Sequence, residues 1–403
     1  MNSESTTPST GQSSLWKATF NTTSVFLGIG IITLPYALSR GGWVSLLLCI
    51  VIAMMTCYTG MLLKACMDAN PSLTTYLDIV ERAFGNKWRI IASMFLNTEL
   101  YLVALSLMIV ESENLHKLFP TFSIKHGGGA TIISGRKTFV LITACITLPT
   151  MLLTDLSILS YVSVMGVLSS LLIVGSLISI GISKVGFHAQ GHQLWNMSGI
   201  PTAMSFYIFC FAGHPVLPSI YVSMRHRQQF IKVLMISFLL TTTTCLVIAV
   251  IGYLMYGGGV QSQITLNLPT SEAGAKVAIY TLLLIPITRF ALLVTPVASS
   301  IEGHLPQKYQ NRSLIQRAVR LVILASSTLL AYFFPYFETL VGILGSIFIV
   351  LASFLLPCAC YIKLTHSFRT WSCKLVATLA IMVFGVLAGV LGTYTTIVDL
   401  VNH

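Results

Sequence analysis

The stretch FLGIGIITLPYALSRGGW, residues 26–43, combines the apolar composition of a membrane helix with residues that interrupt helices. Gly28, Gly30 and Pro35 fall inside it. In a helix interior, glycine is destabilising by roughly 1 kcal/mol and proline by about 3 kcal/mol relative to alanine. The stretch therefore predicts one of two structures, an ordinary kinked helix or a span that is unwound within the membrane.

The composition of the whole chain excludes an ordinary soluble protein. Of its 403 residues, 55% are hydrophobic and 9% are charged, whereas a soluble domain carries about 25% charged residues. Apolar runs of about 20 residues, each able to cross a bilayer core of roughly 30 Å, recur along the chain. We predict about eleven spans, at 17–39, 43–67, 89–113, 138–153, 157–183, 199–222, 230–256, 272–300, 314–335, 338–362 and 371–398. The chain is expected to be an all-α polytopic membrane protein.

The termini and the charges indicate how this protein is organised. Residues 1–14 are polar and rich in Ser and Thr, and we expect them to form a disordered cytosolic tail before one transmembrane domain, residues 15–403. The net charge of +11 resides at the ends of the predicted spans, which indicates a lipid bilayer and not nucleic acid as the partner. Because cytosolic loops are enriched in Lys and Arg, the distribution predicts a cytosolic N-terminus. An odd number of spans then places the C-terminus in the lumen.

The interruption of the first span recurs in the sixth. There the sequence FCFAGHPVLPSIY, residues 209–221, places Gly213 five residues before Pro218, just as Gly30 precedes Pro35. Five spans separate the two stretches, and an odd shift reverses their orientation in the membrane. The pattern predicts a five-plus-five inverted repeat with broken helices 1 and 6, an arrangement that marks the central site of many transporters.

Two such breaks favour a binding site over two ordinary kinks. Unwound backbone survives in a membrane only where protein or water satisfies its polar groups. Exposed amides at the first break favour a carboxylate, and exposed carbonyls at the second suit an ammonium group, so together they can hold a zwitterion. The Thr-rich start of the first span is expected to pack against other helices, and its Thr23 can also reach the substrate. We assign the substrate site to Thr23, Gly28, Ile29, Gly30, Phe211, Ala212, Gly213 and His214.

Both interrupted spans resemble signatures of a known family. NTTSVFLGIGIITLPYALSRGGW, residues 21–43, is similar to the first-span signature of the amino acid/auxin permease family, and FAGHPVLPSIY, residues 211–221, to its sixth-span signature. The similarity extends from about residue 14 to residue 403. Within the family it is greatest to the plant and yeast vacuolar amino acid transporters, relatives of the vesicular inhibitory amino acid transporter. The resemblance implies the inverted-repeat fold and proton-linked transport of amino acids.

Ionisable residues inside spans are functional candidates because each costs about 3 kcal/mol or more. Glu99 lies near the middle of the third span and Arg289 near the middle of the eighth. Their opposite charges predict a pair that acts in proton coupling or gating, with a static structural ion pair as the alternative. Asn97 and Tyr101 bracket Glu99 and either line the same pathway or pack. His214 either titrates near neutral pH or caps freed carbonyls, and we favour capping.

Signatures of enzymes and of metal sites do not occur in the sequence. It contains no HExxH motif, no P-loop and no GxSxG elbow. His188 and His192 have helical spacing but no Cys or acidic residues beside them, which is typical of a solvated loop. We expect no enzymatic activity, no catalytic residues, no metal and no cofactor, with a proton gradient as the driving force.

The sequence therefore predicts a secondary active transporter of neutral amino acids that works as a monomer by proton-coupled alternating access. A membrane amino-acid sensor that uses the same pocket without completing transport is the alternative. A channel would be expected to show a carbonyl filter or rings of like charge. The resemblance favours antiport across the vacuolar membrane, and symport at the plasma membrane is the second option.

Overall fold

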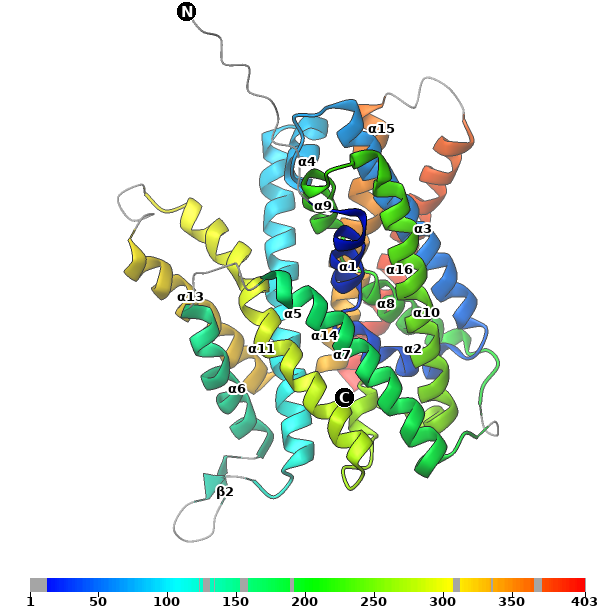
Figure 1. Ribbon diagram of the computed structural model, residues 1–403, viewed down its shortest axis with the longest axis vertical. Coiled ribbons are helices and arrows are strands. Elements are labelled where there is room, and N and C mark those ends of the chain that lie inside the picture. Colours follow the sequence, from blue (N-terminus) through cyan, green and yellow to red (C-terminus); the bar gives the residue numbers. More distant parts are fainter. Residues whose placement is uncertain are drawn as a thin grey trace, which may run out of the picture.

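The computed structural model describes residues 13–122, 124–125, 131–133, 135–152, 159–188, 192–306, 312–334, 336–365 and 372–402, which are almost entirely helical (Figure 1). The helices of the first half are α1 (Leu15–Phe26), α2 (Leu34–Gly41), α3 (Ser45–Ala69), α4 (Tyr76–Phe84), α5 (Asn86–Leu118), α6 (Gly135–Leu152) and α7 (Leu159–Ile180). Those of the second half are α8 (Ile200–Cys210), α9 (Leu217–Ser223), α10 (Phe230–Tyr256), α11 (Ala273–Gly303), α13 (Ser313–Phe333), α14 (Phe337–Ile343), α15 (Leu356–Leu364) and α16 (Cys373–Asn402).

Short segments connect or interrupt these helices. The 3-10 segments are η1 (Ile29–Thr33), η4 (Met197–Gly199), η5 (His214–Val216), η6 (Arg227–Gln229), η7 (Gly257–Gly259) and η8 (Ile264–Leu266). The π-helical segments are η3 (Gly181–Val185), η9 (Leu344–Ile349) and η10 (Leu351–Leu355). Two short strands, β1 (Ile124–Lys125) and β2 (Thr131–Ile133), pair antiparallel in the loop after α5.

The first predicted span is a broken helix. α1 ends at Phe26, the next two residues leave the helical path, and η1 then leads into α2. The two halves of the span are bent by 44°. Pro35 lies in the first turn of α2, where its missing N–H removes no helical hydrogen bond. The prediction of a break in this span is confirmed.

The predicted sixth span is interrupted in the same way. α8 ends at Cys210, residues 211–213 are not helical, and η5 leads into α9. Pro215 and Pro218 occupy the first turns of η5 and α9, so each proline again begins a helical segment. The Gly/Pro pattern thus identified both interruptions.

Reciprocal packing relates the two halves of the chain. α1 and α2 of the first half pack on α10 of the second, and α8 and α9 of the second half pack on α3 of the first. In the same way α6 packs on α5, and α13 packs on α11. The predicted five-plus-five inverted repeat is confirmed, with α16 following the second repeat. α1 lies in the middle of the bundle, and α6 and α13 form its flank (Figure 1).

The number of spans differs slightly from the prediction. Nine helices in the described part of the chain are long and apolar enough to cross a membrane, or ten if the bent pair α1 and α2 is one span. The segment predicted at 138–153 forms α6, an 18-residue helix that begins with Gly135, Arg136 and Lys137 and is not among these candidates. Basic residues in its first turn and Pro149 near its end lower its mean hydropathy.

The two ends of the bundle are held by different contacts. We call the end at which α1 begins the N-terminal end, and the end at which α16 finishes the C-terminal end. At the N-terminal end the amide of Ser13 donates to the carbonyl of Ser223 at 2.9 Å, and Tyr221 Oη donates to Asp68 Oδ1 at 2.5 Å. At the C-terminal end Arg40 pairs with Asp399 at 3.6 Å. Of the tail predicted at residues 1–14, all but Ser13 and Ser14 lies outside the described residues.

Candidate functional site

The first break leaves backbone amides without partners. In the described part of the chain, the amides of Ile29 and Gly30 donate no hydrogen bond, because the helical path ends at Leu27 and Gly28. Both residues are buried. A buried donor without a partner costs about 1–3 kcal/mol. These amides are therefore available to a bound anionic group such as a carboxylate.

The second break leaves the opposite kind of group. The amides of Phe211 and Ala212 bond back to Ile208 and Phe209, but the carbonyls of residues 210–212 accept no hydrogen bond from any described residue. Carbonyl oxygens are acceptors that suit an ammonium group. The predicted residues Phe211 and Ala212 thus present the acceptors that the zwitterion hypothesis requires.

The two breaks lie in direct contact. A Cβ added to Gly30 would lie 2.9 Å from Cys210 Sγ and 3.1 Å from Cys210 Cα. A Cβ added to Gly213 would lie 2.7 Å from Val25 Cγ1 and 2.9 Å from the Phe26 ring. These separations are shorter than normal carbon contacts, so both positions require glycine. The structure thus packs the first break directly against the second.

Thr23 lies one helical turn before the first break. Its side chain is 3% exposed, and its hydroxyl oxygen has no hydrogen-bond partner among the described residues. This hydroxyl is therefore available to a bound group. Its neighbour Thr22, by contrast, donates to the carbonyl of Ala18 at 2.8 Å.

His214 is fully buried, and its Nε2 lies 3.1 Å from the carbonyl of Thr56 and 2.9 Å from Thr59 Oγ1. Since a carbonyl only accepts, Nε2 carries the proton and donates to Thr56 on α3. Nδ1 has no partner among the described residues. His214 therefore bonds to a carbonyl of α3 and not to the carbonyls freed by its own break, which the favoured interpretation had expected.

Arg289 reaches the first break from α11. Its Nη2 donates to the carbonyl of Ser24 at 2.9 Å and to the carbonyl of Leu27 at 3.3 Å, and it lies 3.4 Å from Ser24 Oγ. A Cβ on Gly28 would lie 3.5 Å from Nη1 of the same guanidinium. Arg289 thus lies beside the predicted substrate residues.

Glu99 does not lie with them. It is 7% exposed, and no ion pair joins it to Arg289 in the part of the chain that the structure describes. The ion pair suggested by the sequence is therefore not formed, because the guanidinium binds the main chain of α1. Glu99 lies close enough to Tyr76 on α4 to interact with it electrostatically, and the Tyr76 hydroxyl donates to the carbonyl of Ala352 at 2.7 Å.

The residues that bracket Glu99 have structural partners. Asn97 Nδ2 donates to Ser300 Oγ on α11 at 2.9 Å, and Tyr101 Oη donates to Ser326 Oγ on α13 at 2.9 Å. Both therefore tie α5 to its neighbouring helices, which supports packing over lining a pathway. The sequence reasoning missed Glu111, which is 1% exposed with one carboxylate oxygen unpartnered among the described residues. Glu111 lies in the same predicted span as Glu99, residues 89–113, so a second carboxylate in that apolar run could have identified it.

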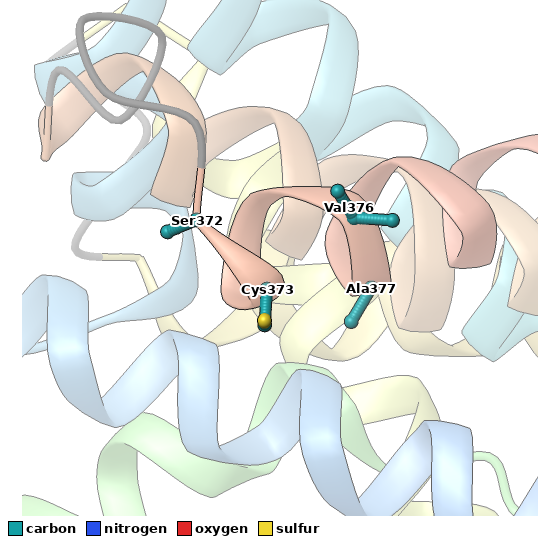
Figure 2. Close-up of a pocket in the computed structure, with 4 residues that line it drawn as sticks. All are labelled: Ser372, Cys373, Val376 and Ala377. Carbon is teal, nitrogen blue, oxygen red and sulfur yellow. The ribbon is translucent and has the colours of Figure 1, made fainter.

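Two further features lie apart from the breaks. His188 Nε2 bonds to the carbonyl of Val185 at 3.0 Å, and His192 Nε2 bonds to the carbonyl of Tyr253 at 2.9 Å, so the two rings serve different parts of the chain. Figure 2 shows a pocket at the start of α16 that is lined by Ser372, Cys373, Val376 and Ala377. None of these residues belongs to a broken span.

Comparison with solved structures identifies the same architecture. MhsT in complex with L-phenylalanine superposes with a TM-score of 0.63 over 96% of this chain and 99% of that chain, at 11% sequence identity. The substrate-bound, outward-open state of a Na⁺-coupled sialic acid symporter superposes with a TM-score of 0.52 over 96% and 88% of the two chains, at 14% identity. At these identities the likeness concerns the fold alone.

Comparison of sequences finds relatives of much higher identity. The amino acid transporter AVT1I of Arabidopsis thaliana is 42% identical over 393 residues, which cover 97% of this chain and 96% of that protein. AVT1J of the same plant is 38% identical over 97% and 92% of the two chains. These relatives are named as transporters and not as enzymes, in agreement with the prediction. Because residues 11–398 match the profile of the family described as transmembrane amino acid transporter protein, the chain belongs to this family.

Proposed function

We propose that this protein is a secondary active transporter that binds the backbone of a neutral amino acid between the two breaks. The observation that carries the proposal is the contact between two breaks, one with unpartnered amides at Ile29 and Gly30 and the other with unpartnered carbonyls at residues 210–212. The amides donate hydrogen bonds to the carboxylate of the substrate, and the carbonyls accept hydrogen bonds from its ammonium group. Neutral side chains fit best, since Arg289, the cation beside the first break, is already bonded to α1 and so is not available to an acidic side chain of a substrate.

Alternating access in this proposal moves the helices that hold the breaks. At the N-terminal end, the contact of Ser13 with Ser223 and the hydrogen bond of Tyr221 to Asp68 close the path beside α9. Release on that side requires both contacts to break. Tyr221 Oη to Asp68 is a charge-assisted hydrogen bond worth about 1.5–3 kcal/mol, a range that substrate binding can overcome.

Coupling to protons is the second part of the proposal. The guanidinium of Arg289 places a permanent positive charge at the C-terminal end of α1, where the helix dipole favours a cation. We propose that it takes the place of a bound sodium ion. A carboxyl group enclosed by protein without a counter-charge is far cheaper to bury when it carries a proton. We propose that Glu99 takes up and releases the transported proton, with the proton gradient as the driving force and no cofactor.

The proposal also covers the membrane, the orientation of the chain and its oligomeric state. Residues 15–403 form one transmembrane domain after a cytosolic tail, and the protein works as a monomer. The similarity to vacuolar amino acid transporters supports the vacuolar membrane and exchange of amino acids for protons. The positive-inside distribution supports a cytosolic N-terminus and a lumenal C-terminus.

The proposal is tested by uptake of labelled amino acids into proteoliposomes with a pH gradient, a sodium gradient or neither. We expect saturable uptake that a pH gradient drives above equilibrium and that sodium does not affect. Binding of amino acids without uptake under any gradient would indicate a sensor and would overturn the proposal of transport.

A further inference from the structure

A cavity of about 310 Å³ opens at the C-terminal end of the bundle, away from the breaks. It lies where α5, α8, α14 and α16 meet, together with the loop that holds Ser262. Its lining combines three acidic residues, four Ser or Thr residues and three aromatic residues: Glu113, Glu338, Asp399, Thr202, Ser262, Thr339, Thr396, Phe206, Tyr336 and Phe337. A cavity of this size can hold one small organic molecule.

The three carboxylates of this cavity differ in whether a cation or a hydrogen-bond donor lies beside them. Glu113 accepts a hydrogen bond from Gln263 Nε2 at 2.5 Å and has Arg136 nearby, and Asp399 pairs with Arg40. Glu338 forms no ion pair and no hydrogen bond with any described residue, although Asp399 is close enough to repel it. Of the three carboxyl groups, that of Glu338 is therefore the one left for a bound donor.

A second observation points to a bound donor. Thr202 lines the cavity and is 5% exposed, and its Oγ1 finds no hydrogen-bond partner in the described part of the chain. Most buried hydroxyls bond to protein or to ordered water, so the hydroxyl of Thr202 is available to a bound donor. Phe206 and Tyr336 add aromatic faces, which attract organic cations.

The arrangement of the carboxylates selects the class of cation. No group of three His, Cys, Asp or Glu residues is close enough to hold a metal ion among the described residues. A cation that carries several hydrogen-bond donors and an apolar stem fits the lining better. We propose that this cavity binds the primary ammonium group of an amine, with the side chain of a basic amino acid as the natural source.

The position of the cavity separates it from the breaks. Thr202 lies on α8, eight residues before Cys210, which is about 12 Å along a helix. An amine held here would lie at the opposite end of α8 from the second break. The ammonium site is therefore distinct from the proposed substrate site and does not depend on the proposed function.

The test uses pentylamine, which has one ammonium group and no carboxylate and so cannot occupy the proposed site at the breaks. Its binding to the purified full chain in nanodiscs is measured by calorimetry at low salt, beside binding of a labelled neutral amino acid. Glu338→Gln and Thr202→Val are compared with Glu272→Gln, a matched change at a carboxylate that pairs with Lys184 outside the cavity. Thermal melting of each variant checks its folding.

We expect saturable binding of pentylamine, weakened at least roughly tenfold by Glu338→Gln because a hydrogen bond to a charged group is lost. Thr202→Val weakens it less, Glu272→Gln leaves it unchanged, and the neutral amino acid binds all three variants equally. Two results would overturn the ammonium site. One is the absence of saturable pentylamine binding to the unmodified protein. The other is an affinity for pentylamine in both Glu338→Gln and Thr202→Val that equals that of the unmodified protein. Should Glu338→Gln fail to fold, Thr202→Val decides alone. If the unmodified protein binds pentylamine but not the neutral amino acid, only the proposed function is contradicted.

Discussion

Arg289 donates a 2.9 Å hydrogen bond to the main-chain carbonyl of Ser24, and thereby caps a helix that ends inside the membrane. Ser24 would bond to the amide of Gly28 in a continuous helix, but that amide bonds to Phe26 instead. The carbonyl of Leu27 accepts a second bond from the same nitrogen. The guanidinium therefore satisfies the carbonyls that the first break sets free.

The capping by Arg289 predicts that lysine will not replace it. Arg289→Lys keeps the charge, but the lysine nitrogen lies one bond nearer its own main chain than Nη2 and does not reach the carbonyls of both Ser24 and Leu27. Losing one charged hydrogen bond of about 1.5–3 kcal/mol predicts uptake at least tenfold slower in proteoliposomes. Arg82→Lys, on the exposed face of α4, is the matched control and is expected to leave uptake unchanged. Normal uptake by Arg289→Lys would show that the bonds of Nη2 to both carbonyls are not needed.

The contact of Gly30 with Cys210 predicts that no larger residue fits at the first break. Gly30→Val introduces a Cβ 3.1 Å from Cys210 Cα, which forces the two broken spans apart at a cost of about 1–3 kcal/mol. We expect loss of amino-acid binding while the protein still inserts into membranes. Gly258→Val is the control, because nothing lies within 4 Å of a Cβ at that position. Equal substrate affinity in the two variants would remove Gly30 from the site.

The sequence predicted the breaks well because their cause is local. Gly30 with Pro35 and Gly213 with Pro218 disfavour a continuous helix whatever surrounds them. The partners of Glu99 and Arg289 could not be predicted in this way. Depth along a helix follows from counting residues, but the direction of each side chain depends on how helices rotate against one another. Arg289 bonds to α1, and Glu99 forms no ion pair with it, which no count along one chain reveals.

The isolation of Glu99 predicts a specific transport defect. Glu99→Gln keeps the size of the side chain but cannot release a proton. We expect exchange of labelled for unlabelled amino acid to continue, while accumulation driven by a pH gradient is lost. Glu272→Gln, at a surface ion pair, is expected to behave like the unmodified protein in both assays. Accumulation by Glu99→Gln at the normal level would exclude Glu99 from coupling.

The positions of the chain termini predict their accessibility. Ser13 is bonded at the N-terminal end of the bundle, and Asp399 pairs with Arg40 at the opposite end. A protease added to intact vacuoles is therefore expected to remove a tag from the N-terminus and to leave one at the C-terminus untouched. Cleavage of both tags would place the two ends on the same side and would require a different number of spans.

The central claim is that the two breaks hold the carboxylate and the ammonium group of an amino acid together. The most direct measurement is competition against a labelled neutral amino acid bound to the purified protein. The competitors are the unlabelled amino acid, its decarboxylated amine and its N-acetyl derivative. We predict that the amino acid competes fully, and that the amine and the N-acetyl derivative each bind at least roughly tenfold more weakly, because each leaves buried amides or carbonyls unpaired. Competition by either analogue at the affinity of the intact amino acid would contradict the account.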